Sequence, residues 1–146
     1  MKKIIFWAVG FAIVIQVIRP DYTNQPIDKN ITLDTDSQVM NVLKTSCYDC
    51  HSNETQYLWY HNVAPVSWVL SSNIENGRKA LNFSNWKNID PKVKLERLER
   101  AKKVVNNNMM PKSEYVLMHE NAALGADEKR LLEAFFDAQI KELSVL

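Results

Sequence analysis

The chain has 146 residues, which is enough for one domain with a hydrophobic core of its own. Its net charge of +1 leaves no basic excess, so the composition argues against a nucleic-acid partner. Glycine is scarce, with three residues, and this disfavours β-sandwiches and Rossmann folds, which need many tight turns. We therefore expect an all-α protein.

Residues 1–19 have the pattern of a membrane-targeting segment. Lys2 and Lys3 precede an apolar run over residues 4–18, and Arg19 follows that run. Because no small-residue cleavage site comes next, we expect an uncleaved signal anchor, with a cleaved signal as the alternative. The anchor would be a single-pass helix in the cell inner membrane, with the rest of the chain on the periplasmic, extracytoplasmic side.

Two further regions are expected after the anchor. Residues 20–33 are polar and include two prolines, which predicts a linker or a loosely held strap. Residues 34–146 are expected to form the folded domain. Its first helix would begin after a capping Asp34 or Asp36 and would carry the cysteine-containing segment at its C-terminal end.

Three more helices are expected in this domain. The second covers "PVSWVLSSNIENGRKAL", with Pro65 in its first turn. The third begins at Asp90, a capping residue followed by proline, and the last follows Gly125 with Asp127 as its cap. Helical spacing also predicts the buried face of the second helix, which comprises Val66, Val69, Leu70 and Ile74.

The stretch "KTSCYDCHSN" contains both cysteines of the chain, Cys47 and Cys50, with His51 directly after them. A disulfide across so short a loop would remove little chain entropy, and a redox-active pair is expected beside a strand, which the sequence does not predict. A zinc site would need a fourth ligand such as His61 or His119, but a second C-x-x-C or H-x-x-x-H pair is missing. Both interpretations leave part of the pattern unexplained.

A covalently bound haem accounts for all three residues. In a helical turn, Cys47 and Cys50 share one face, where each thiol can form a thioether with a haem vinyl group. His51 can then bind the iron as the proximal ligand. Covalent haem attachment in bacteria takes place outside the cytoplasm, which is the side that the N-terminal segment predicts. We therefore expect one haem c.

A second axial ligand is expected on the other side of the iron. Met110 is the first candidate, because a thioether suits haem iron and the following Pro111 would stiffen the loop that holds it. The other candidates are Met109, His119, Met118 and His61. Methionine ligation would raise the reduction potential, whereas bis-histidine ligation with His119 would lower it.

Further residues are candidates for the walls of the haem pocket and for its hydrogen bonds. The second ring nitrogen of His51 should donate to a backbone carbonyl, and we nominate that of Pro65. Aromatic side chains could line a flat ligand, and basic or hydroxyl groups could meet the haem propionates. These candidates are Trp59, Trp68, Trp86, Arg78, Lys79 and Tyr115.

Beyond the motif, "CYDCHSNET", "WYHNVAPVSWVL", "IENGRKALNFSNW" and "MPKSEYVLMHENAAL" resemble the haem-binding domain family of small bacterial mono-haem c-type proteins. The resemblance covers residues 43–124 together with the N-terminal hydrophobic segment. It implies a small, cytochrome c-like helical domain, covalent haem at Cys47 and Cys50, and His51 as the proximal ligand. It also makes the segment of Met110 the distal element.

The function that we predict is single-electron transfer by a membrane-anchored cytochrome c. Its partners would be redox proteins of the respiratory chain or of the periplasm, near which the anchor would hold it. An electron carrier needs no catalytic residue, so we expect no enzyme activity. The alternative is a haem-based sensor or a peroxidase-like enzyme with a displaceable distal ligand, in which His119 or Glu120 would act.

Overall fold

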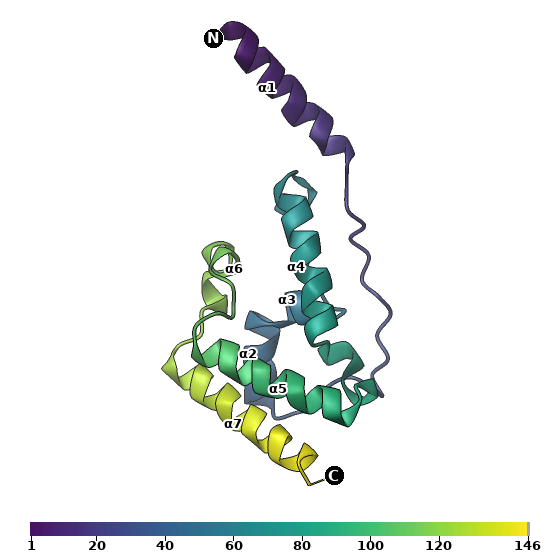
Figure 1. Ribbon diagram of the computed structural model, residues 1–146, viewed down its shortest axis with the longest axis vertical. Coiled ribbons are helices and arrows are strands. Elements are labelled where there is room, and N and C mark those ends of the chain that lie inside the picture. Colours follow the sequence, from purple (N-terminus) through teal and green to yellow (C-terminus); the bar gives the residue numbers. More distant parts are fainter. Residues whose placement is uncertain (146) are drawn as a thin grey trace.

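A computed structural model describes residues 1–145, and every regular element in that range is helical. The α-helices are α1 (Lys2–Val14), α2 (Ser37–Ser46), α3 (Tyr48–His51), α4 (Val66–Ala80), α5 (Pro91–Asn106), α6 (Ser113–Met118) and α7 (Ala126–Leu143) (Figure 1). Four short 3-10 helices join them: η1 (Ile15–Val17), η2 (Trp59–Asn62), η3 (Phe83–Asn88) and η4 (Glu120–Ala122). The all-α prediction is confirmed.

The hydrophobic core lies where α2, α5 and α7 meet. Helices α5 and α7 run side by side in Figure 1, and α2 lies against them. Leu43 of α2, Leu98 of α5 and Leu132 of α7 are each 0% exposed. Trp86 of η3 extends the core, because its ring packs 6.4 Å from that of Phe135 in α7. This packing fixes α2, the helix that leads into the cysteine motif.

Two of the predicted helix starts are confirmed by their caps. The Asp36 carboxylate accepts a hydrogen bond from the backbone N–H of Gln38 at 2.8 Å, so α2 begins where the sequence indicated. Asp90 accepts from the N–H groups of Lys92 and Val93 and caps α5 in the same way. The predicted cap of α7 was wrong: Gly125 is the capping residue, and Asp127 lies inside the first turn, where a negative charge favours the helix dipole.

Helix α4 begins one residue after Pro65 and buries a different face from the predicted one. Ile74 is buried as expected, but Val66 and Val69 are 46% and 60% exposed. Small side chains take the inner face instead, with Ser67 and Gly77 buried beside Ile74. Helical spacing grouped the large apolar residues of this helix but did not show which of them the protein itself covers.

The segment 20–33 lies along the domain as a strap and is held by hydrogen bonds at several points. The Asn24 side chain donates to the Thr55 carbonyl at 2.9 Å. Farther along, the backbone of Leu33 donates to the Phe83 carbonyl at 2.8 Å, and Ile31 accepts from the backbone of Lys87. Figure 1 shows this strap running from the end of α1 past α4 to the base of the domain.

Helix α1, the expected anchor, extends away from the domain (Figure 1). It buries none of its residues, and large apolar side chains such as Phe6, Trp7 and Phe11 are about 70% exposed around it. Within residues 1–145, no helix combines the length and the apolar character that crossing a membrane requires.

Candidate functional site

The C-x-x-C-H motif forms a helical turn that is separate from α2. Helix α2 ends at Ser46, and the Cys47 carbonyl accepts hydrogen bonds from the backbone N–H groups of Cys50 at 3.2 Å and His51 at 2.9 Å. This turn places the two cysteines three positions apart on one helical face. The sequence prediction that the first helix would lead into the cysteines is confirmed, with a break at Cys47.

The His51 ring is oriented by a backbone carbonyl. Its Nδ1–H donates to the carbonyl oxygen of Leu81, which lies 3.0 Å away at the C-terminal end of α4. Because Nδ1 is the donor, Nε2 is the nitrogen that can bind a metal. Burial lowers the pKa of His51 and so favours the neutral, ligating form. The nomination of the Pro65 carbonyl was wrong: that oxygen accepts from the backbone of Trp68 within α4.

The two thiols are not joined, and their environment disfavours thiolate chemistry. Cys47 and Cys50 are both free. Burial raises the pKa of Cys47 to about 12 and that of Cys50 to about 11, with Asp49 adding to the second. A redox-active pair needs the opposite shift. Within residues 1–145, no group of three or more His, Cys, Asp and Glu side chains could hold a metal ion, so the zinc interpretation finds no support.

Helix α4 packs closely on the motif at Gly77. A Cβ atom built on this glycine would collide with the Cys50 carbonyl oxygen and would lie 3.1 Å from the Cys50 Cβ. Glycine is therefore required by the close approach of α4 and α3. The same approach brings the end of α4, and so the Leu81 carbonyl, within reach of His51.

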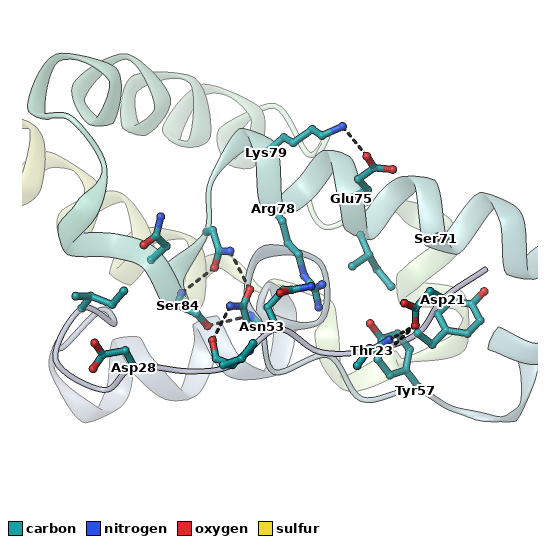
Figure 2. Close-up of a pocket in the computed structure, with 17 residues that line it drawn as sticks. Asp21, Thr23, Asp28, Asn53, Tyr57, Ser71, Glu75, Arg78, Lys79 and Ser84 are labelled. Carbon is teal, nitrogen blue, oxygen red and sulfur yellow. Dashed lines mark hydrogen bonds and ion pairs between the residues drawn. The ribbon is translucent and has the colours of Figure 1, made fainter.

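Arg78, the next residue of α4, holds the loop that follows the motif. Its guanidinium donates to the Ser52 carbonyl at 2.8 Å, to the Asn24 side chain at 2.8 Å and to the Thr55 hydroxyl at 2.9 Å. In Figure 2, Arg78 points from α4 toward Asn53 and the strap, whereas Lys79 points away and pairs with Glu75. The sequence analysis predicted Arg78 as a partner of the haem propionates. In the structure, three of its N–H groups donate instead to the loop after the motif and to the strap.

A large cavity lies between the strap and α4 but does not border the motif. It measures about 590 Å³, and its lining includes Arg78, Asn53, Tyr57 and Glu75 (Figure 2). Neither cysteine lines it, and His51 does not line it either. This cavity is therefore separate from Cys47, Cys50 and His51, although two of the predicted pocket residues, Arg78 and Lys79, line it.

A smaller cavity of about 30 Å³ borders the motif on the side of α6. Cys50 lines it together with Tyr115 and His119 of the α6 segment and with Tyr60 of η2. The Tyr115 hydroxyl donates to Asp49 at 2.8 Å, so α6 is tied directly to the motif. Of the predicted pocket residues, Tyr115 lines this cavity together with Cys50.

The predicted distal ligands occupy contrasting environments. Met110 lies between α5 and α6, outside any helix as predicted, and packs partly buried against the core, whereas Met109 is 63% exposed. His119 Nδ1 donates to the Tyr115 carbonyl at 3.0 Å, and its Nε2 accepts from the Tyr60 hydroxyl at 3.1 Å. His61 is 5% exposed, and its Nδ1 accepts from the backbone of Leu58.

The three predicted aromatic walls are not gathered around the cysteines. Trp59 is 75% exposed on η2. The Trp68 ring N–H donates to the Ile18 carbonyl at 2.7 Å, toward the N-terminal segment. Trp86 belongs to the core with Phe83 and Phe135. None of the three lines the small cavity beside Cys50.

Several residues of the site were missed by the sequence analysis. Asp49 and Tyr60 anchor the α6 segment, and Gly77 sets the spacing of α4 from the motif. A glycine in the middle of a helical pattern, as at Gly77, was a usable signal for close packing. Tyr60 gave no such signal, because its partner His119 is distant in the sequence.

Comparison with known proteins assigns the family. A family model described as "haem-binding domain" matches residues 10–138. The chain therefore belongs to the haem-binding domain family, as the resemblance of the motif and its flanking segments implied. Neither the curated proteins nor the solved structures contained a match to this chain.

The donor chemistry of the motif fits a haem. The site offers a neutral, buried imidazole with Nδ1 already bonded to a carbonyl, which is the usual arrangement of a histidine that binds a metal. The two thiols beside it are protonated at neutral pH and free. The donor set that binds haem iron in proteins includes histidine and methionine, and both types are available in this domain.

Proposed function

We propose that this protein is a membrane-anchored, mono-haem c-type cytochrome that transfers single electrons outside the cytoplasm. The observation that carries the proposal is the C-x-x-C-H turn in which Leu81 orients His51, in a chain of the haem-binding domain family. Cys47 and Cys50 would hold the haem through thioethers, and His51 would bind its iron through Nε2. When bound, the haem would supply a one-electron iron couple.

The protein's own residues would hold the motif rigid during electron transfer. Leu81 keeps the imidazole in one orientation, and Gly77 allows α4 to lie against Cys50. Arg78 ties the following loop to α4 and the strap. A rigid site suits electron transfer, because little rearrangement then accompanies a change in the charge of the iron.

We propose Met110 as the distal ligand, with His119 as the alternative. Met110 follows α5 and is partly buried against the core, whereas its neighbour Met109 is mostly exposed. Both ring nitrogens of His119 have hydrogen-bond partners within the protein, which supports a structural role for this histidine. Methionine ligation would fill the sixth position of the iron, as electron transfer without substrate binding needs, and would raise its reduction potential.

The N-terminal segment supports the proposed location. Helix α1 presents an apolar surface that is exposed on every side, and Lys2 and Lys3 favour a cytoplasmic N-terminus. We propose that this segment anchors the protein in the inner membrane, where flanking Lys and Arg side chains can snorkel and the bilayer can thin to match a short helix. The haem domain would lie on the periplasmic side, within reach of respiratory redox partners.

The distal ligand can be tested by spectroscopy of the full chain exported beside a haem-attachment system. The wild-type ferric protein should show the weak long-wavelength band of a methionine–iron bond, and its ferrous form should resist carbon monoxide. Met110→Ala should lose the band, take up carbon monoxide readily and have a lower reduction potential. Met109→Ala, the matched control, should keep all three properties.

Two results would contradict this assignment. If the wild-type protein lacks the long-wavelength band and His119→Ala loses the distal ligand, then His119 is the ligand. Ready carbon monoxide binding by the wild-type protein would instead indicate an open or weakly held position, as a haem-based sensor or a peroxidase-like enzyme needs.

A further inference from the structure

One end of the domain carries a cluster of exposed apolar side chains, which we call the apolar tip. It consists of Leu58, which precedes η2, Trp59 of η2, Val63 in the following loop, and Val66 and Val69 in the first turns of α4. Trp59 is 75% exposed, Val69 60%, and the other three between 41% and 46%. Val66 and Val69 lie three positions apart and so share a face of α4.

The apolar tip lies within an uncharged stretch of the sequence. Residues 55–74 contain no Asp, Glu, Lys or Arg, although 24% of the whole chain is charged. A surface that faces water normally carries interspersed charges, so an exposed surface without them indicates a partner that does not tolerate them. The composition therefore separates this end of the domain from the charged faces of α5 and α7.

The N-terminal apolar segment is fixed to the same end of the domain. The Gln16 side chain accepts from the backbone N–H of Ala64 at 2.9 Å and donates to the Ala64 carbonyl at 3.2 Å. The Trp68 ring N–H donates to the Ile18 carbonyl at 2.7 Å. Figure 1 shows the end of the α1 segment close to the start of α4.

These contacts make the exit from the apolar segment a fixed junction. Two backbone groups of Ala64 and one ring N–H are paired with residues 16–18, and the Tyr22 hydroxyl continues the attachment by donating to the Ser67 carbonyl. A segment that was only a flexible tether would not need such pairing. Wherever α1 is embedded, the apolar tip must therefore lie next to the point where the chain emerges.

We propose that the apolar tip rests in the interfacial layer of the bilayer that holds α1, so that the domain has a fixed orientation on the membrane. This inference depends on the proposed membrane anchor. Tryptophan and aliphatic side chains are favoured in that layer, where Trp59 can bury its ring and keep its N–H near water. Arg19, which is exposed at the junction, lies where lipid phosphates would be.

The position of Trp59 relative to lipid can be measured by fluorine NMR of the full, haem-loaded chain. The protein is labelled with 5-fluorotryptophan and placed in phospholipid nanodiscs that contain a lipid with a nitroxide near the top of its acyl chain. The four tryptophans give four probes, assigned by single Trp→Phe variants. Signal intensities are compared with those in matched discs that lack the nitroxide.

The proposal predicts that Trp59 and Trp7 both lose most of their intensity, while Trp86, which is buried in the core, keeps its own. If the Trp7 signal loses intensity and the Trp59 signal keeps it, the proposal is wrong, and the apolar tip would instead bind a protein partner. Full intensity at both would overturn the membrane anchor as well. The haem spectrum of the same sample tests the cytochrome assignment separately.

A charged variant shows whether the apolar surface itself is responsible. The double substitution Val66→Glu and Val69→Glu should restore the Trp59 signal while Trp7 stays attenuated. Val93→Glu, at a partly exposed valine near the start of α5, is the matched control and should change neither signal. Attenuation of Trp59 that persists in the double variant, with an unchanged Trp86 signal and haem spectrum, would contradict the proposed contact.

Discussion

At the scale of single residues, Gly77 and Leu81 prepare the site for His51. Gly77 lets α4 approach Cys50, and four residues later the Leu81 carbonyl meets the His51 ring. A backbone acceptor at this position cannot be removed by changing a side chain, so the ring orientation depends on where α4 lies. Gly77 is the residue that sets this position.

Replacing Gly77 by alanine tests that dependence. In an exposed helix interior this change stabilises by about 1 kcal/mol, because alanine is the better helix former. Here the added methyl group meets the Cys50 backbone, so we expect a loss of about 1–3 kcal/mol in the free energy of unfolding. Denaturant unfolding of the haem-loaded protein measures it, with Asn76→Ala, at an exposed position of the same helix, as the control. An equally stable Gly77→Ala protein would show that α4 and the motif are not in close contact.

At the scale of elements, the strap, α4 and the loop after the motif depend on one another through Arg78. Its guanidinium joins Ser52, which is 0% exposed, to Asn24 of the strap and to Thr55 of the loop. The three acceptors are arranged around a planar, forked donor, and a lysine ammonium cannot reproduce this arrangement. This makes the strap part of the folded domain, rather than a spacer between the membrane and the domain.

Arg78→Lys therefore should behave as a loss and not as a conservative change. We expect about 1–3 kcal/mol less stability, because buried acceptors lose their partner, together with faster proteolysis within residues 20–33. Lys79→Arg is the matched control on the same turn, since Lys79 pairs with Glu75 on the surface. Unchanged stability and proteolysis in Arg78→Lys would show that the strap is held by its other contacts alone.

The sequence predicted those elements whose signals are local. Asp36 and Asp90 cap helices as expected, because an N-cap uses only backbone groups two or three residues away. The His51 acceptor was missed since it lies 30 residues away and depends on the packing of α4. Val66 and Val69 were misplaced because helical spacing identifies an apolar face but does not say whether protein or another medium covers it.

At the scale of the whole molecule, the structure separates an apolar end from a charged body. Helix α1 and the apolar tip lie together, joined by the bonds of Gln16 and Trp68, while the core of α2, α5 and α7 lies at the other end (Figure 1). The C-x-x-C-H turn and its smaller cavity lie beside α4 and η2. On the proposed membrane, this arrangement would hold the haem at a constant distance from the bilayer and from partners embedded in it.

The proposed cytochrome requires that Cys47 and Cys50 bind haem covalently. The direct measurement is extraction of the full chain, matured beside a working haem-attachment system, with acidified acetone. We predict that the haem stays with the precipitated protein, as shown by its absorption spectrum in alkaline pyridine, and that Cys47→Ala with Cys50→Ala releases or never acquires it. Haem that passes entirely into the acetone from the wild-type protein, or a colourless wild-type protein beside a correctly matured control cytochrome, would contradict the account.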